Sequence, residues 1–274
     1  MSGPPLSAQL GATAGPAGPV AASSGVVGRV AIITGAGRNI GRALALGFAA
    51  AGAKVVVADR DHVGAAEVAH EIEAKGGVGL PVEVDIGDSD SVARMADTVA
   101  ARFGRIDILV NNASRFNDLA RVPFQAIDLA EWRSTLEVNV TGTFQCIRAV
   151  EPSMRAQRWG RIVNVSSGTV RMGRVDFLHY VTSKSALIGM TRSLARELGP
   201  HGITVNTLLP GVVFTEDQQK NLRPDYRSMI LNSQCIPEML NPEAIVGPTL
   251  FLCSGESGYV TGQELAVDGG LTHG

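Results

Sequence analysis

Short apolar runs alternate with longer amphipathic stretches along most of the chain, and this alternation constrains the fold more than any other feature. The run 29–34 is apolar through its middle, as a strand requires when both faces of its sheet are covered. The stretch 39–51 that follows is rich in alanine and leucine and stops at Gly52, as a helix does. Repeated strand–helix units of this kind predict a doubly wound parallel α/β sheet with helices on both faces.

The same reading continues to the end of the chain and predicts about seven strands in a single domain. The strands are expected at 29–34, 54–59, 78–84, 106–110, 161–165, 203–208 and near 264–267. The helices are expected at 39–51, 61–75, 89–103, 128–157, 177–198 and 242–253. Composition does not change between these units, so no linker divides them.

Residues 1–27 differ from the rest, because they are mostly Gly, Ala, Pro and Ser and include no charged side chain. They lack the basic start and apolar centre of a secretory signal, and they lack the arginines of a transit peptide. We expect 1–27 to be a flexible tail and 28–274 to be the Rossmann-type domain.

Composition excludes several classes of partner. The formal net charge of −2 in 274 residues gives no electrostatic reason to bind nucleic acid or an anionic membrane. No apolar run is long enough to cross a bilayer. Cys146, Cys235 and Cys253 lie far apart with no histidine pair nearby, so we expect reduced thiols in a cytoplasmic protein and no metal site.

A glycine-rich loop follows the first predicted strand, with glycines at Gly35, Gly37 and Gly41. Glycines allow a tight turn and let the backbone approach a ligand closely. The helix that starts after the loop offers free N–H groups and the positive end of its dipole to an anion. Because the loop lies between a strand and a helix, it predicts a pyrophosphate site and hence a dinucleotide.

Asp59 ends the second predicted strand, roughly twenty residues past the glycine loop, where an acidic residue can accept hydrogen bonds from the adenosine ribose. Its charge disfavours the 2′-phosphate of NADP, so we expect NAD. Arg38 and Arg60 point the other way, because either could pair with that phosphate. NADP therefore stays open as the alternative cofactor.

Several further motifs occur in one order along the chain, and together they are more specific than any one of them. They are Thr34–Gly41, Asn111-Asn112-Ala113, Asn139, Ser167, Tyr180-Val-Thr-Ser-Lys184, Pro210-Gly211 with Thr215, and Val267-Asp268-Gly269-Gly270. From about Val27 onward the chain resembles a single-domain short-chain dehydrogenase/reductase. Two positions depart from the family pattern: Asn39 replaces the middle glycine of the loop, and Ser114 stands where glycine is common. Asparagine tolerates left-handed backbone angles, so Asn39 need not break the turn.

The resemblance implies a catalytic set of Asn139, Ser167, Tyr180 and Lys184. Tyr180 and Lys184 are four residues apart and share one face of a helix. The lysine charge and the oxidised nicotinamide are expected to lower the tyrosine pKa, so that Tyr180 acts as acid and base. Ser167 is implied to bind the reacting oxygen, with Ser166 as its rival. Asn139 is implied to bend its helix and to support a water that links the lysine to solvent.

The resemblance also implies the cofactor contacts. They are Gly35, Gly37, Arg38, Asn39, Ile40, Gly41, Asp59, Arg60, Asp85, Ile86, Asn112, Ala113, Tyr180, Lys184, Pro210, Gly211, Val213 and Thr215, with Asn111 also beside the ribose. The substrate pocket is expected from Ser114–Asn117, Gly168–Phe177 and Phe214–Leu240. His179 is expected to be a packed residue or a wall of that pocket.

These residues predict an NAD-dependent oxidoreductase that transfers a hydride between a secondary alcohol or ketone and the nicotinamide. An NADP-dependent ketone or 3-oxoacyl reductase is the alternative within the class. A non-catalytic dinucleotide sensor is the alternative outside it. The resemblance further implies a homotetramer with a small-molecule alcohol or ketone as its substrate.

Overall fold

A seven-stranded parallel sheet forms the centre of the computed structural model, which describes residues 25–215 and 224–273. The strand order is β3-β2-β1-β4-β5-β6-β7. The strands are β1 (Val30–Thr34), β2 (Lys54–Asp59), β3 (Val78–Glu83), β4 (Ile108–Asn111), β5 (Gly160–Val165), β6 (Ile203–Pro210) and β7 (Glu264–Val267). This confirms the predicted doubly wound, Rossmann-type sheet. The order reverses between β1 and β4, and a crevice at their carboxyl ends is where such sheets bind ligands.

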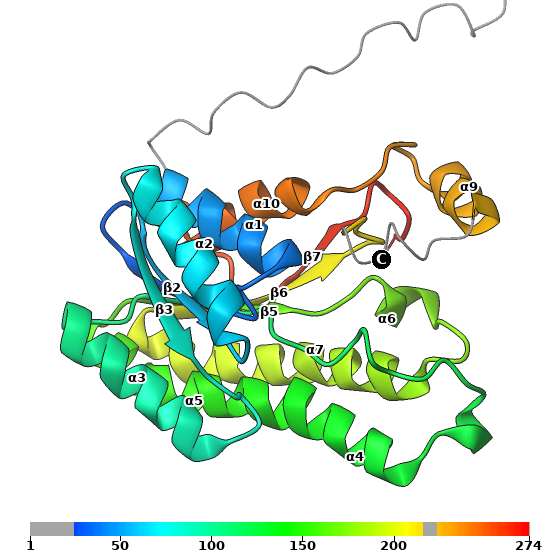
Figure 1. The fold of residues 1–274 in the computed structure, drawn as a ribbon, viewed down its shortest axis with the longest axis horizontal. Helices are drawn as coiled ribbons and strands as arrows, with labels where there is room; N and C mark the ends of the chain where they lie inside the picture. Colours follow the sequence, from blue (N-terminus) through cyan, green and yellow to red (C-terminus); the bar gives the residue numbers. More distant parts are fainter. Residues whose placement is uncertain (1–24, 216–223, 274) are drawn as a thin grey trace, which may run out of the picture.

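Helices cover both faces of the sheet (Figure 1). One layer contains α1 (Asn39–Ala50), α2 (His62–Ala74) and α10 (Val246–Cys253), and the other contains α3 (Ser89–Phe103), α4 (Leu129–Leu136), α5 (Thr143–Gln157) and α7 (Leu178–Leu198). Shorter elements are η2 (Phe124–Ala126), η3 (Glu137–Gly142), α6 (Thr169–Met172), η4 (Gly199–His201), α9 (Pro224–Ser233) and η5 (Pro242–Ile245). No helix within the described residues is long and apolar enough to cross a membrane.

The buried strand β1 shows how the sequence makes the two layers. All five of its residues are buried. Side chains alternate between the faces of a sheet, so Ala31 and Ile33 join the core under α1 and α2, while Val30 and Ile32 join the core under α3 and α5. A strand that is apolar at every position therefore fits a sheet with helices on both sides.

The structure differs from the sequence expectation in the long helix predicted over 128–157. It consists of α4, one π-helical stretch η3, and α5. A π turn places one extra residue in the helical path, and such turns occur often at functional sites. Neither glycine nor proline marks the centre of η3, so periodicity alone could not reveal it.

The packed part of the chain also starts earlier than the predicted boundary at residue 28. Val26 is fully buried and belongs to the core under α1. The backbone N–H of Gly28 donates to the carbonyl oxygen of Gly52 over 2.8 Å, which ties this segment to the turn before β2. The predicted flexible tail otherwise falls on residues 1–24, outside the described part of the chain.

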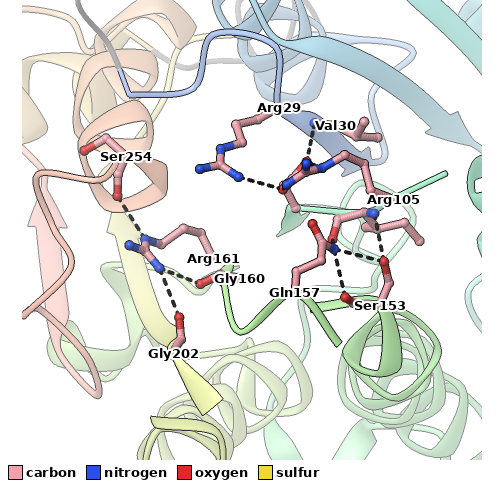
Figure 2. Close-up of polar contacts among 11 residues, drawn as sticks. Arg29, Val30, Arg105, Ser153, Gln157, Gly160, Arg161, Gly202 and Ser254 are labelled. Carbon is pink, nitrogen blue, oxygen red and sulfur yellow. Dashed lines mark hydrogen bonds and ion pairs between the residues drawn. The ribbon is translucent and has the colours of Figure 1, made fainter. Parts of the chain in front are cut away.

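Charged residues meet at the amino ends of the strands, and Figure 2 shows this cluster. The Asp107 side chain is fully buried. It accepts hydrogen bonds from Arg29 over 3.0 Å, from the backbone N–H of Val30 over 2.9 Å and from Nε of Arg105 over 2.8 Å. Asp107 directly precedes β4, so its carboxylate joins the amino end of β4 to the start of β1.

Arg161, at the start of β5, is a buried cation on the same edge of the sheet (Figure 2). Its guanidinium donates to the carbonyl oxygens of Ser254 over 2.9 Å and Gly160 over 2.8 Å, and it lies over the Trp159 ring at 4.5 Å. These contacts fasten the last helix to the sheet. Structural contacts thus fill the edge of the sheet at the amino ends of the strands. The edge at the carboxyl ends is where a ligand can bind.

Candidate active site

One large cleft opens at the carboxyl ends of the strands, with a volume of about 1170 Å³. That exceeds the range of about 300–1,000 Å³ common for small-ligand pockets, so it has room for a cofactor and a substrate together. Most predicted site residues line it: Gly35, Arg38, Asn39, Ile40, Gly41, Asp59, Arg60, Asp85, Ile86, Asn112, Ala113, Ser167, Tyr180, Lys184, Pro210, Gly211, Val213 and Thr215. Gly37 and Asn139 are predicted residues that do not line it.

The glycine loop between β1 and α1 is packed too tightly for side chains. Gly35 has a positive φ of 65°, and a Cβ there would lie 2.8 Å from Cα of Ala113. A Cβ on Gly41 would lie 1.9 Å from the carbonyl oxygen of Gly35. The loop therefore folds back on the start of α1 and leaves backbone N–H groups at that helix end for an anion.

Asn39 opens α1 with a positive φ of 51°, which confirms that asparagine takes the left-handed angle at this position. Gly37 belongs to the glycine loop but does not line the cleft. Its backbone N–H donates to Oδ2 of Asp59 over 2.8 Å, and a Cβ on Gly37 would come within 3.1 Å of that oxygen. The carboxylate at the end of β2 thus holds the loop in place.

The turn after β4 is fastened to the same loop by Asn112. Its side-chain amide donates to the carbonyl oxygens of Thr34 over 3.0 Å and Gly35 over 3.2 Å. The hydroxyl of Thr34 accepts in return from the backbone N–H groups of Asn112 and Ala113. The ends of β1 and β4 are therefore locked together on both sides of the crevice.

Asn111 differs from the expectation that it lies beside the ribose. Its side chain is buried and donates to Oδ1 of Asn164 over 2.9 Å, and Asn164 donates on to Thr191 over 2.9 Å. This chain of hydrogen bonds across β4, β5 and α7 gives the buried Asn111 amide nitrogen an acceptor, whereas its Oδ1 is buried without a hydrogen-bond partner. Asn111 supports the sheet beneath the site, whereas Asn112 and Ala113 face the cleft.

Asp85 and Ile86 line the cleft after β3. Asp85 closes a tight turn there, because its Oδ1 accepts from the backbone N–H of Gly87 over 2.9 Å. Pro210, Gly211, Val213 and Thr215 line the cleft after β6. Gly211 is needed for close packing, because a Cβ there would lie 2.8 Å from Cβ of Asp268.

Tyr180 lies in the first turn of α7 with its side chain buried. Burial raises the pKa of Tyr180 to about 12, whereas a hydrogen bond with Ser167 and the charge of Arg174 act to lower it. The sequence led us to expect a lowered pKa through Lys184 and the oxidised nicotinamide. In the protein alone desolvation dominates, so the phenol holds its proton at neutral pH.

Lys184 lies one turn further along α7, with its Nζ 5.7 Å from the centre of the Tyr180 ring. The side chain is 2% exposed. Its Nζ donates to the carbonyl oxygen of Val165 over 2.8 Å, and burial lowers the pKa of Lys184 to about 7. The ammonium is therefore held at the end of β5 and loses its charge easily.

The two adjacent serines after β5 have different surroundings. Ser166 is buried, and its hydroxyl donates to the carbonyl oxygen of Lys184 over 2.8 Å. Ser167 accepts from the N–H of Thr169 over 3.2 Å and from the Thr169 hydroxyl over 2.9 Å. Ser167 also hydrogen-bonds with Tyr180, so its hydroxyl lies next to the phenol oxygen in the cleft.

Asn139 lies in η3 behind the cleft and is buried. Its Oδ1 accepts from the backbone N–H of Arg115 over 2.7 Å. Its amide donates to the Arg115 carbonyl oxygen over 3.2 Å and to the Ser183 hydroxyl over 3.0 Å. Asn139 is therefore a positioning residue, which holds the loop that contains Arg115 against α7.

Two phenylalanine rings that the sequence did not single out pack against the tyrosine. The Phe177 ring stacks on Tyr180 at 4.8 Å, and Phe116 lies 5.0 Å from Tyr180 and 5.7 Å from Phe177. Phe116 and Phe177 fall within the predicted pocket segments, but nothing in their spacing marks them. The part of that pocket predicted at 216–223 lies outside the described residues.

His179 is fully buried and packs edge-on against Phe177, which fits the expectation of a packed residue. Its Nε2 lies 3.7 Å from a carboxylate oxygen of Glu131 in α4. It does not line the cleft. Within residues 25–215 and 224–273, no group of His, Cys, Asp or Glu side chains could hold a metal ion.

Known proteins are similar to this chain in sequence. The family described as enoyl-(acyl carrier protein) reductase matches residues 35–272. A 3-oxoacyl-[acyl-carrier-protein] reductase from Synechocystis is 37% identical, covering 89% of this chain and 96% of its own. The short-chain reductase NovJ from Streptomyces niveus is 39% identical, covering 88% of this chain and 93% of its own.

Solved structures agree with these sequences. A structure of a proposed NAD(P)-dependent gluconate 5-dehydrogenase from Beutenbergia cavernae, with NADP bound at low occupancy, superimposes with a TM-score of 0.84. It is 39% identical, and the match covers 90% of this chain and 97% of that one. The chain therefore belongs to the short-chain dehydrogenase/reductase family.

Proposed function

We propose that this protein reduces a ketone to a secondary alcohol with a nicotinamide dinucleotide, and that Tyr180 supplies the proton. The observation that carries the proposal is the buried Tyr180 phenol, hydrogen-bonded to Ser167 in the cleft that the glycine loop borders. Burial raises the pKa of the phenol, so Tyr180 is protonated at neutral pH and can donate a proton to a ketone oxygen. A bound reduced dinucleotide supplies the hydride.

The protein's own groups position the reacting carbonyl. The Ser167 hydroxyl hydrogen-bonds with Tyr180 and lines the cleft, so it can donate to a ketone oxygen that takes the place of the phenol oxygen as its acceptor. Tyr180 donates its proton to that same oxygen as negative charge develops there. Lys184 holds its ammonium at the end of β5, next to the tyrosine, where it favours the phenolate that is left.

The relatives support NADP and a 3-oxo substrate more strongly than the NAD-dependent alcohol dehydrogenase expected from the sequence. Relatives from Synechocystis and Staphylococcus aureus are named 3-oxoacyl-[acyl-carrier-protein] reductases, and the Beutenbergia structure has NADP bound at low occupancy. In this chain Arg38 and Arg60 line the cleft and can bind a 2′-phosphate. We therefore propose an NADP-dependent 3-oxo reductase.

Asp59 has a structural role that weakens the sequence argument for NAD. Both of its carboxylate oxygens accept backbone hydrogen bonds, from Gly37 over 2.8 Å and from Asp61 over 3.0 Å. Its presence is therefore explained without a ribose. Its charge still opposes a 2′-phosphate, and on that observation an NAD-dependent enzyme is the second candidate.

Steady-state rates with NADPH and NADH test both candidates, with a panel of 3-oxoacyl thioesters, simple ketones and 2-enoyl thioesters as substrates. We expect ketone reduction with a preference for NADPH, and we expect Asp59→Ala to increase that preference. A clear preference for NADH in the wild-type protein would support the NAD-dependent candidate instead.

The Tyr180→Phe variant tests the mechanism in the same assay. Loss of the proton donor is expected to lower turnover by about 10²–10⁴-fold while dinucleotide binding is kept. Unchanged turnover would refute the role of Tyr180. If the wild-type protein bound NADPH but reduced no substrate, the non-catalytic sensor would be the better proposal. The homotetramer and the cytoplasmic location stay predictions, and sedimentation analysis tests the first.

A further inference from the structure

His179 is a buried titratable side chain that the proposed mechanism does not use. It directly precedes Tyr180 in α7 and is fully buried. Within the described residues, neither of its ring nitrogens has a hydrogen-bond partner. A buried polar group without a partner costs free energy, and a phenylalanine would fill the same space without that cost. The polar ring therefore needs a reason beyond packing.

Glu131 in α4 supplies that reason. Its Oε2 lies 3.7 Å from Nε2 of His179. Hydrogen bonds between nitrogen and oxygen are about 2.7–3.2 Å long, so a shift of about 1 Å makes one here. The Glu131 side chain is 17% exposed and the His179 side chain is enclosed, so the carboxylate has the greater freedom to move. The bond forms with a ring that has its proton on Nε2 and with a doubly protonated ring.

The other carboxylate oxygen of Glu131 holds the loop 114–121, which follows β4. Oε1 accepts from the backbone N–H of Ala120 over 3.1 Å. Leu119, the residue before it, is buried in one cluster with Tyr180. The remaining residues of the loop line the cleft: Ser114, Arg115, Phe116, Asn117, Asp118 and Arg121. The position of Glu131 therefore decides how closely this wall of the cleft approaches the tyrosine.

Aromatic packing fixes the other end of this connection. The His179 ring meets Phe177 edge-on, with the ring centres 5.5 Å apart. Phe177 in turn stacks on Tyr180 at 4.8 Å. The histidine is thereby held at a set position relative to the phenol, and Glu131 lies between this fixed point and the loop.

We propose that His179 is a positioning residue, which holds the Glu131 carboxylate and through it the loop 114–121 beside a ketone that faces Tyr180. This inference rests on the proposed ketone reduction. His179 does not line the cleft, so it acts through its neighbours rather than on the substrate. Phe116 of the loop lies 5.0 Å from Tyr180, so we expect the effect to fall on the ketone and not on the dinucleotide.

His179→Phe is the discriminating variant, because it keeps a ring against Phe177 and removes both nitrogens. We would measure kcat/KM for the ketone that the substrate panel shows to be reduced fastest, with a saturating dinucleotide. It should fall by about tenfold or more, since a misplacement of about 1 Å can cost that much. The KM for the dinucleotide should not change and the melting temperature should not fall, because the variant removes unpaired polar atoms.

His179→Gln is the conservative variant, because its amide N–H can replace Nε2 as a donor to Glu131. We expect it to recover part of the activity that His179→Phe loses. A residue that only fills space would show the opposite order, since phenylalanine matches the shape of the ring better than glutamine does. His179→Leu replaces His179→Phe in the comparison if the larger ring prevents folding.

A double-mutant cycle tests whether His179 acts through Glu131. Glu131→Ala removes both contacts of the carboxylate and should lower kcat/KM at least as much as His179→Phe does. The double variant should be no worse than Glu131→Ala alone, because the second substitution then removes nothing further. Ser134→Ala is the matched control, since the Ser134 hydroxyl also joins α4 to this loop, through the Arg115 guanidinium. Its loss should multiply with that of His179→Phe.

An unchanged kcat/KM in folded His179→Phe would overturn the proposal while leaving ketone reduction intact. Losses that multiply between His179→Phe and Glu131→Ala would also overturn it. If the wild-type protein reduced no ketone, the proposed function would fail first, and amide hydrogen exchange of residues 114–121 would decide instead. Exchange about tenfold faster in His179→Phe than in the wild type supports the link to the loop, and equal exchange refutes it.

Discussion

Lys184 donates a hydrogen bond from its Nζ to the carbonyl oxygen of Val165 over 2.8 Å, at the carboxyl end of β5. The contact fixes the lysine against the sheet, one helical turn from Tyr180. Because the side chain is almost completely buried, its pKa falls to about 7. The protein thus keeps a lysine whose protonated form is destabilised by the fold itself.

This burial predicts how stability depends on pH. The lysine pKa is about 7 in the folded protein and near 10.5 in an unfolded chain. Between these values the unfolded chain binds more protons, so the free energy of unfolding rises with pH. We expect the melting temperature to rise from pH 7 to pH 9. The window ends there because burial raises the pKa values of Cys146, Cys253 and Tyr180, and these groups act in the opposite direction at higher pH.

The Lys184→Met variant should lose most of this rise, because it removes the titrating group and keeps the apolar stem. Lys75→Met is its control, since Lys75 is exposed and pairs with Glu71 at the surface. Differential scanning calorimetry across the window checks both. A wild-type melting temperature that stays flat, or falls, from pH 7 to pH 9 would contradict the buried lysine.

The two serines after β5 give a second prediction. Ser167→Ala removes the hydroxyl that faces Tyr180, and we expect kcat to fall by about 10²-fold or more with little change in dinucleotide affinity. Ser166→Ala removes a buried bond to the Lys184 carbonyl, so it should lower stability by about 1 kcal/mol and change kcat less. Steady-state kinetics and thermal unfolding of both variants check this. The reverse order of kinetic losses would assign the role to Ser166.

Sequence reasoning predicted the features whose signal is local. Apolar runs such as β1 indicate strands covered on both faces, and a left-handed angle at Asn39 follows from the residue type. The strand boundaries were also close, since β2 begins and ends as expected. The glycine loop could be placed because a strand and a helix border it.

Features that depend on packing between distant segments could not be predicted. The family resemblance implied a bend at Asn139, but periodicity gave no sign of the π turn there, and the hydrogen bond of Asn139 reaches a loop residue 24 positions away. The pairing of Asn111 with Asn164 depends on the register of β4 against β5. The guanidinium carbon of Arg121 lies 5.3 Å from the centre of the Phe177 ring, and a contact between two separate loops of this kind has no motif in the sequence.

A third prediction concerns the phosphate loop. A Cβ on Gly41 would lie 1.9 Å from the Gly35 carbonyl oxygen, so Gly41→Ala must displace the loop. We expect dinucleotide affinity to fall by at least about tenfold, because the backbone groups that bind the anion move. Gly199→Ala is the control, since nothing lies within 4 Å of its Cβ position. Fluorescence titration with NADPH measures both, and equal affinities in the two variants would mean that the loop tolerates a side chain.

The last prediction separates stability from catalysis, at the edge of the sheet opposite the cleft (Figure 2). Asp107→Ala leaves Arg29, Arg105 and the backbone N–H of Val30 without their shared acceptor. Because the carboxylate is fully buried, we expect the free energy of unfolding to fall by about 3 kcal/mol, the lower end for a broken buried ion pair, since both arginines still reach solvent.

Glu71→Ala is the matched control for that loss. Glu71 also lies between two basic residues, Arg42 at 2.6 Å and Lys75 at 2.8 Å, but its side chain is 31% exposed. Surface pairs contribute about 0–1 kcal/mol, so this variant should unfold nearly as the wild type does. Urea unfolding measures both changes. The KM values of folded Asp107→Ala should match the wild type, because the cluster lies at the amino ends of the strands. A changed KM for the dinucleotide would show that this edge influences the cleft through β1 and β4.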